Sequence, residues 1–222
     1  MPGVLAVAKR EPSLMLLTGQ LAAVLLYPFM IGNDVGRSLF SVFGIAILGL
    51  VVFAVRSTPG LNGVTILLGI PATVLLVIQA VTQSDELLAY SSALEALLYF
   101  YAAGAMTAYM LGDQRVTRDE LFAIGATFTL VAWAFAYTYT VCQAIYPGSF
   151  TAAVDAGSDR DWMELLFLSF STLSSTGIGD VVPVKPFARS LVMFEMTAGV
   201  AYLTVVVSRL VALTVMRPDR QR

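Results

Sequence analysis

Residues 172–180 read Thr-Leu-Ser-Ser-Thr-Gly-Ile-Gly-Asp and lie between two long apolar segments. The chemistry open to such a stretch is the binding of a dehydrated cation by backbone oxygen atoms. Replacing the water around a cation requires successive carbonyl groups turned to one side, and glycine adopts the positive φ angles that this geometry needs. Gly177 and Gly179 occupy alternate positions of the stretch. We therefore interpret it as an ion selectivity filter.

The composition argues against other chemistries. The chain has no histidine and a single cysteine, Cys142, so neither a zinc site nor a haem site is expected. Without histidine, and with isolated carboxylates that form no recognisable pair, the chain is not expected to be an enzyme. A net charge of -2 and the lack of a basic run argue against nucleic acid as a partner. We expect no cofactor other than permeant ions.

The hydropathy of the chain predicts an all-α integral membrane protein. Its residues are 58% hydrophobic and 13% charged, which is too apolar for a water-soluble surface over most of its length. A bilayer core of roughly 30 Å needs about 20 apolar residues per helix. The predicted spans are 14–31, 38–55, 64–82, 89–111, 120–145 and 187–215. A shorter apolar stretch, Met163–Leu173, suits a re-entrant pore helix buried in protein.

The positions of Lys and Arg predict the orientation of these spans. With both termini in the cytoplasm, only Arg37, Arg160, Lys185 and Arg189 lie outside, which the positive-inside rule favours. We expect the acidic residues then placed outside to concentrate cations near a pore entrance. For all of them except Asp180, the alternative is that they only solvate the loops. They are Asp34, Asp85, Glu86, Asp155, Asp159, Asp161, Glu164 and Asp180.

The predicted organisation has a front section and a pore section. Residues 1–112 form a four-helix front section, residues 113–217 a pore section, and residues 218–222 a short cytoplasmic tail. The filter stretch does not repeat within the chain. A pathway lined by one loop per chain needs several copies around an axis, so we expect a homotetramer.

The section from Asp119 to Met216 resembles the pore module of the tetrameric potassium channel superfamily, the pore-loop cation channels. In that family an outer helix, a pore helix, a filter and an inner helix follow one another. The family filter reads Thr-Val-Gly-Tyr-Gly-Asp, and this chain reads Ser175-Thr176-Gly177-Ile178-Gly179-Asp180. Pro183, Arg189 and Gly199 also match family positions. The resemblance is to a bacterial member with six spans.

The resemblance implies roles for single residues. Potassium would be bound by the Ser175 hydroxyl and by carbonyl oxygens of the filter, which are those of Thr176, Gly177, Ile178 and Gly179. Asp180 and Ser171 would support the filter, with Ser171 standing where some bacterial members carry a glutamate. The pore helix would aim the negative end of its dipole at the ion. We expect Ser158 or Asp159 to cap that helix at its start.

Two departures from the family filter bear on selectivity. Ile178 replaces the aromatic residue that braces the filter, and Thr176 replaces an apolar valine. We expect potassium selectivity, and weakly selective monovalent cation conduction is the alternative. The fourth span carries no arginine, and Glu95 is its only charged residue. Voltage sensing needs several positive charges moving in the field, so we expect no sensor of that kind.

Three features of the spans leave alternatives open. Glu95 and Glu195 are acids at membrane depth, so each has either a structural or a functional role; for Glu195 these are filter support, or gating and permeation. Gly199 is either an inner-helix hinge or a small residue that permits close packing. A stripe of apolar residues either lines the cavity and its mouth, or faces lipid or the outer helix. The stripe is Val200, Leu203, Val207, Val211 and Val215.

Taken together, these patterns predict a passive cation channel in a plasma membrane, with a prokaryotic source indicated by its short loops. The expected fold has six transmembrane helices, with a re-entrant pore helix and filter between the fifth and the sixth. Its expected partners are other copies of the chain, membrane lipid and monovalent cations. A secondary transporter with an unwound helix is a further alternative, but it predicts inverted repeats with paired breaks, and the sequence shows a single break.

Overall fold

The computed structural model describes residues 11–29, 44–54, 62–82, 87–112 and 117–215. These residues form helices with one small two-stranded sheet. The helices are α2 (Pro12–Leu26), the short 3-10 helix η1 (Tyr27–Phe29), an unlabelled helix Gly44–Ala54, α4 (Asn62–Thr82), α5 (Leu88–Leu111), α6 (Arg118–Ile145), α7 (Trp162–Leu173) and α8 (Pro186–Val215). The strands are β1 (Phe150–Ala152) and β2 (Val181–Pro183).

Four helices in the described residues are long and apolar enough to cross a membrane. They are Pro12–Phe29, α5, α6 and α8. Part of the second predicted span lies outside the described residues, and its described portion, Gly44–Ala54, is shorter than a span. The described apolar part of α4 is Ile66–Ile78. The mostly helical structure is therefore consistent with an all-α membrane fold, whereas the count of six spans stays a prediction.

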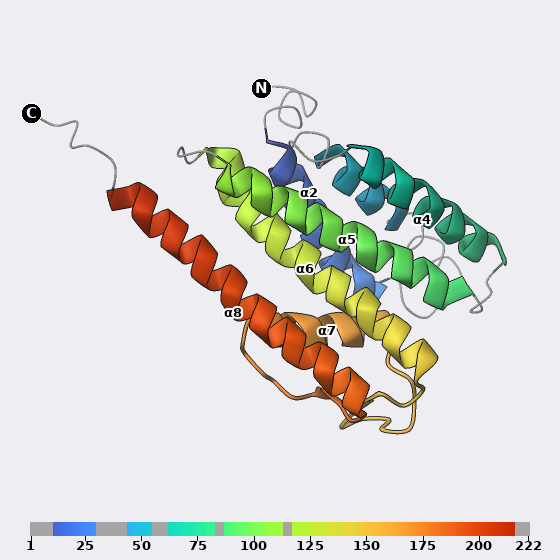
Figure 1. The fold of residues 1–222 in the computed structure, drawn as a ribbon. Coiled ribbons are helices and arrows are strands. Elements are labelled where there is room, and N and C mark those ends of the chain that lie inside the picture. Colours follow the sequence, from blue (N-terminus) through green and yellow to red (C-terminus); the bar gives the residue numbers. More distant parts are fainter. Residues whose placement is uncertain (1–10, 30–43, 55–61, 83–86, 113–116, 216–222) are drawn as a thin grey trace, which may run out of the picture.

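Helix α6 lies at the centre of the structure because its buried faces carry small side chains. Five of them are Ala123, Ala126, Ala132, Ala134 and Ala136. Small residues let helices approach closely in a membrane protein, and α5, α2 and α7 all pack on α6. Figure 1 shows α4 and α8 on opposite sides of the α5–α6 pair, with α7 beside the N-terminal half of α8.

Aromatic rings join the front helices to the start of α7. Tyr99 of α5 stacks on Tyr137 of α6, with 5.6 Å between ring centroids. Trp133 of α6 meets Trp162 of α7 edge to face at 5.1 Å. The Tyr137 hydroxyl also hydrogen-bonds Glu95, whose side chain is buried. One of the two predicted membrane acids therefore lies in this aromatic joint.

Helix α7 begins at Asp161 with a reciprocal capping box. The Glu164 backbone N–H donates to Asp161 Oδ1 (2.8 Å), and the Asp161 N–H donates to Glu164 Oε2 (2.7 Å). The expectation that Ser158 or Asp159 caps this helix is wrong. The acidic residue three positions after Asp161 decides the cap, because it satisfies the N–H of the capping residue itself.

The loop before α7 is fixed by a buried arginine and by the two-stranded sheet. The Arg160 guanidinium donates to Glu164 and to the carbonyl groups of Val154, Asp155 and Ser158. The Gln143 side chain of α6 binds both the N–H and the carbonyl of Arg160, each at 2.9 Å. β1 then pairs antiparallel with β2, so the residues after the filter are tied to the loop before α7.

Candidate functional site

The predicted filter lies in an irregular segment, Ser174–Asp180, between the end of α7 and β2. Its backbone has a left-handed conformation at three alternate residues: Ser175 (φ 59°), Gly177 (φ 63°) and Gly179 (φ 76°). Glycine adopts this conformation at no steric cost, whereas a residue with a side chain resists it. The spacing of Gly177 and Gly179 identified the segment from the sequence. The structure adds Ser175 as a third residue with a positive φ angle.

Ser171, in the last turn of α7, holds three successive amide groups of the filter. Its carbonyl oxygen accepts from the N–H of Thr176 (2.9 Å) and of Gly177 (3.0 Å). Its hydroxyl oxygen accepts from the N–H of Ile178 (2.9 Å). One residue thus supports the filter with both its backbone and its side chain.

These amide groups fix the direction of three carbonyl groups. The described peptide bonds are all trans, and in a trans peptide the C=O points opposite to the N–H of the same unit. Because the amides of residues 176–178 face Ser171, the carbonyl groups of Ser175, Thr176 and Gly177 face away from α7. A row of oxygen atoms on one side of the chain is the arrangement that can replace the hydration shell of a cation.

Hydroxyl groups provide further contacts around the filter. Ser174 Oγ and Thr176 Oγ1 lie 2.7 Å apart, and the Ser175 N–H donates to the Thr172 carbonyl at 3.0 Å. The Ile178 side chain is 59% exposed in the single chain. Asp180 is also exposed, and no side-chain hydrogen bond of Asp180 is present among the described residues. The structure therefore brings Ser171 to the filter amides, whereas a supporting role of Asp180 stays a prediction.

Gly199 of α8 lies directly against the end of α7. A Cβ atom placed on Gly199 would come within 2.3 Å of the Leu173 carbonyl oxygen and 3.0 Å of its carbonyl carbon. Real Cβ atoms are excluded from such distances, so only glycine permits this approach of the inner helix to the pore helix. This geometry agrees with the close-packing interpretation of Gly199, and its function as a hinge stays a prediction.

Glu195, one turn before Gly199, is completely buried between three helices. The Tyr139 hydroxyl of α6 donates to Glu195 Oε2, and Ser169 Oγ of α7 contacts Glu195 Oε1. Ser169 Oγ also lies 2.8 Å from the Ala132 carbonyl oxygen of α6. Sequence reasoning missed Ser169 and Tyr139. The available signal was Ser169 itself, a hydroxyl within an apolar helix and two residues before Ser171.

The predicted apolar stripe is exposed along α8. Val200, Leu203, Val207 and Val211 are between 40% and 57% exposed in the single chain, so they do not pack on the outer helix of the same chain. The side chain of Val215 lies outside the described ones. The other face of α8 contacts α6, where the Tyr202 hydroxyl donates to the Ile124 carbonyl at 2.6 Å.

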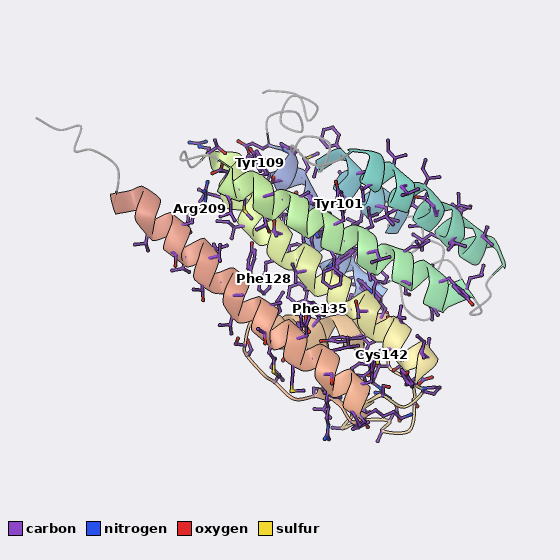
Figure 2. All side chains as sticks on the ribbon, viewed as in Figure 1. Tyr101, Tyr109, Phe128, Phe135, Cys142 and Arg209 are labelled. Carbon is purple, nitrogen blue, oxygen red and sulfur yellow. The ribbon has the colours of Figure 1, made fainter. Side chains whose placement is uncertain are left out.

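The far end of α8 meets the start of α6 in an apolar crevice of about 230 Å³. Tyr202, Ile124 and Leu210 contribute to its walls, and Arg209 Nη2 lies 3.9 Å from Glu120 Oε2 at its edge. Figure 2 labels Arg209 at this end of α8 and Phe128 between α6 and α8. None of the residues that line the crevice belongs to the filter segment Ser174–Asp180, so it is not part of the candidate ion site.

Comparison with known proteins identifies the section that contains these features. Residues 122–216 match a family model described as an ion channel, and this segment includes most of α6 together with α7, the filter and α8. No curated protein and no solved structure shows significant similarity to the chain. The match supports the assignment of residues 122–216 to the pore-loop cation channel superfamily.

Proposed function

We propose that the chain forms a homotetrameric, passive and potassium-selective channel. The observation that carries this proposal is the row of filter carbonyl groups at Ser175, Thr176 and Gly177, turned away from the Ser171 support. The proposed potassium sites use these oxygens together with the Ser175 hydroxyl and the carbonyl groups of Ile178 and Gly179. We expect ions to move down their gradient without an enzymatic step.

Four copies are proposed because one chain offers oxygen on one side only. A cation that loses its hydration shell must be surrounded, and closed rotational symmetry supplies the missing sides. The exposed filter and the exposed apolar side chains of α8, such as Phe194 and Met196, support the idea that this face is covered by other copies or by lipid. Chemical crosslinking in membranes is expected to give tetramers, and a purely monomeric protein would contradict the proposal.

The outer face of the pore is proposed to lie at the α7 start and the filter mouth. Exposed Asp155, Asp159 and Asp180 belong to the segments next to the filter, where negative charge would raise the local cation concentration. This placement corresponds to the predicted orientation with both termini in the cytoplasm. The division at about residue 112 into a front and a pore section also belongs to the proposal, and α5 offers no arginine for voltage sensing.

Weakly selective monovalent conduction is the second candidate. It is favoured by Ile178, whose exposed aliphatic side chain cannot donate a hydrogen bond behind the filter as the family aromatic would. Potassium and sodium fluxes measured separately in liposomes distinguish the two candidates. We expect potassium flux to exceed sodium flux by at least about tenfold, which corresponds to roughly 1.4 kcal/mol. Equal fluxes would favour the second candidate.

A matched pair of glycine variants tests whether the filter carries the flux. Gly177 and Gly148 both have positive φ angles, 63° and 70°, and both have open space for a Cβ atom. Alanine in a left-handed conformation costs roughly 1–2 kcal/mol at either site. We expect Gly177→Ala to lower potassium flux or selectivity, and Gly148→Ala, in the outer loop, to leave both near the wild-type level. Equal effects of the two substitutions would remove the filter from the ion pathway.

A further inference from the structure

Helix α8 holds the pore helix at two points that are one turn apart. Glu195 contacts Ser169, and Gly199 contacts Leu173. Both pairs are spaced by four residues on their own helices, so the contacts follow facing stripes of α8 and α7. One point is a polar contact and the other is close backbone packing. Of the two, only the contact between Glu195 and Ser169 includes a group that can gain or lose a proton as the pH changes.

The number of hydrogen atoms available at Ser169 determines the state of Glu195. A serine hydroxyl has one hydrogen to donate, yet Ser169 Oγ contacts two oxygen atoms, Ala132 O and Glu195 Oε1. The Ala132 carbonyl cannot donate, so the Ser169 hydrogen must occupy that contact. The contact between Ser169 and Glu195 then needs a hydrogen that comes from Glu195.

The surroundings of Glu195 favour the same assignment. Glu195, Ser169 and Tyr139 are all completely buried. A buried carboxylate without a cation is strongly unfavourable, and no ion pair among the described residues includes Glu195. From α6, the Tyr139 hydroxyl contacts Glu195, and Cys142 belongs to the same cluster as the Tyr139 ring. α7 faces Glu195 with uncharged Ser169.

We propose that Glu195 is a neutral carboxylic acid that donates its proton to Ser169 and thereby positions the pore helix. The resulting chain runs from Glu195 to Ser169 and on to the Ala132 carbonyl, while Tyr139 donates to the other oxygen of Glu195. Each oxygen contact in the chain then has one hydrogen. Glu195 of α8 is thereby linked to α6 and to Ser169 of α7. Ser169 lies two residues before Ser171, which holds the filter amides.

Ionisation of Glu195 would remove one hydrogen from this chain. The single Ser169 hydrogen would then serve either Ala132 or Glu195, and the other contact would bring two acceptor oxygens together. This cost appears as pH rises, because the acid loses its proton on that side. We therefore expect alkaline conditions to weaken the contact between α8 and the pore helix.

Infrared spectroscopy of the purified full-length protein tests the protonation state directly. We expect a carboxylic-acid carbonyl stretch at neutral pH that is lost in Glu195→Gln. Glu95→Gln is the matched control, because Glu95 is another buried acid and also hydrogen-bonds a tyrosine. The Glu195 band should persist in that variant. If Glu195→Gln instead loses a carboxylate band, Glu195 is ionised in the wild type and the proposal is overturned.

Ion flux as a function of pH tests the positioning role, which rests on the proposed function. Glutamine has one acceptor oxygen and one donor group, as a neutral acid has, so it should rescue the potassium selectivity that Glu195→Ala loses. We expect the Glu195→Ala potassium-to-sodium flux ratio to fall about tenfold, and wild-type flux to decline at alkaline pH while Glu195→Gln flux does not. Identical pH profiles for wild type and Glu195→Gln would overturn the positioning role.

The two measurements separate the possible failures. A carboxylic-acid band in a protein that conducts no ions would contradict the channel proposal and leave the assignment of the proton intact. Normal potassium flux without that band would contradict the assignment and leave the channel intact. If Glu195→Ala fails to fold, the infrared comparison and the Glu195→Gln pH profile still decide the proposal.

Discussion

The front section and the filter of the pore section are stabilised by different kinds of contact. In the front section, Leu16, Ile47 and Val51 belong to a cluster of apolar and aromatic side chains that packs on α6. In the pore section, the filter depends on hydrogen bonds to the backbone, above all those of Ser171. Dispersion contacts have no preferred direction, whereas hydrogen bonds weaken steeply when their angles change.

This difference indicates where atomic positions matter. Apolar packing tolerates exchanges that conserve volume, so a section built in this way can vary without losing its fold. A filter requires oxygen atoms at defined places, and those places are set by directional contacts to α7. We therefore expect substitutions of similar size to affect ion selectivity in the pore section and mainly stability in the front section.

The largest effect is expected for Gly199→Ala. The new Cβ would overlap the Leu173 carbonyl, and the overlap cannot be relieved by a side-chain rotation because the carbonyl is backbone. Overpacking of this kind costs about 1–3 kcal/mol per chain. We expect a lower melting temperature and loss of potassium flux. Gly104→Ala in α5 is the control, since its Cβ meets open space, and equal losses in both variants would contradict the comparison.

The second-largest effect on the pore is expected for Ser171→Ala. The partly buried Ile178 N–H would lose its acceptor, at a cost of about 1 kcal/mol or more, or up to roughly tenfold in the population of the ordered filter. The potassium-to-sodium flux ratio should fall accordingly. Ser92→Ala provides the front-section control, because Ser92 is also buried, in α5. An unchanged ratio in Ser171→Ala would show that its hydroxyl does not hold the filter.

A smaller effect is expected for Thr176→Val, which keeps the shape of the side chain and removes its contact with Ser174. A net hydrogen bond contributes about 0.5–1.5 kcal/mol, and this one is exposed, so we expect a change of a few fold or less in the flux ratio. Thr73→Val in α4 removes a comparable hydroxyl, which donates to the Gly69 carbonyl at 2.7 Å. It should leave the flux ratio unchanged, and a larger change there than in Thr176→Val would be contrary to expectation.

The smallest effect on the pore is expected for Tyr137→Phe at the aromatic joint. Glu95 would lose its hydroxyl partner, which should destabilise the fold by about 1–3 kcal/mol and lower the melting temperature. The potassium-to-sodium flux ratio should not change. Tyr90→Phe is a suitable control, because that ring is exposed at the start of α5. A shifted flux ratio in Tyr137→Phe alone would mean that the joint transmits changes from the front section to the filter.

The extents of three long helices could be predicted closely from the sequence. The predicted spans 89–111, 120–145 and 187–215 end within two residues of α5, α6 and α8, because long apolar runs leave little freedom in placing a membrane helix. The family match to residues 122–216 agrees with the resemblance found in the same section. The irregular backbone at Gly177 and Gly179 could also be predicted, since glycines at alternate positions favour such a conformation.

The supports of the filter could not be predicted in the same way. Whether Ser171 presents its hydroxyl to Ile178, and whether Gly199 contacts Leu173, depends on how two helices cross, and periodicity does not fix a crossing. The cap of α7 is different, because the spacing of Asp161 and Glu164 is a known local pattern.

The β1–β2 pair has a consequence for how this pore could switch. Val181, directly after the filter, is fixed by its pairing with Ala152, and the amides of residues 176–178 are fixed by Ser171. Between these anchors, the amides of Gly179 and Asp180 have no backbone partner within the described part of the chain. In the proposed channel, a conformational change confined to Gly179 and Asp180 would then stop ion flow while every helix stayed in place. Probes attached to α5 or to the far end of α8 would then report no movement.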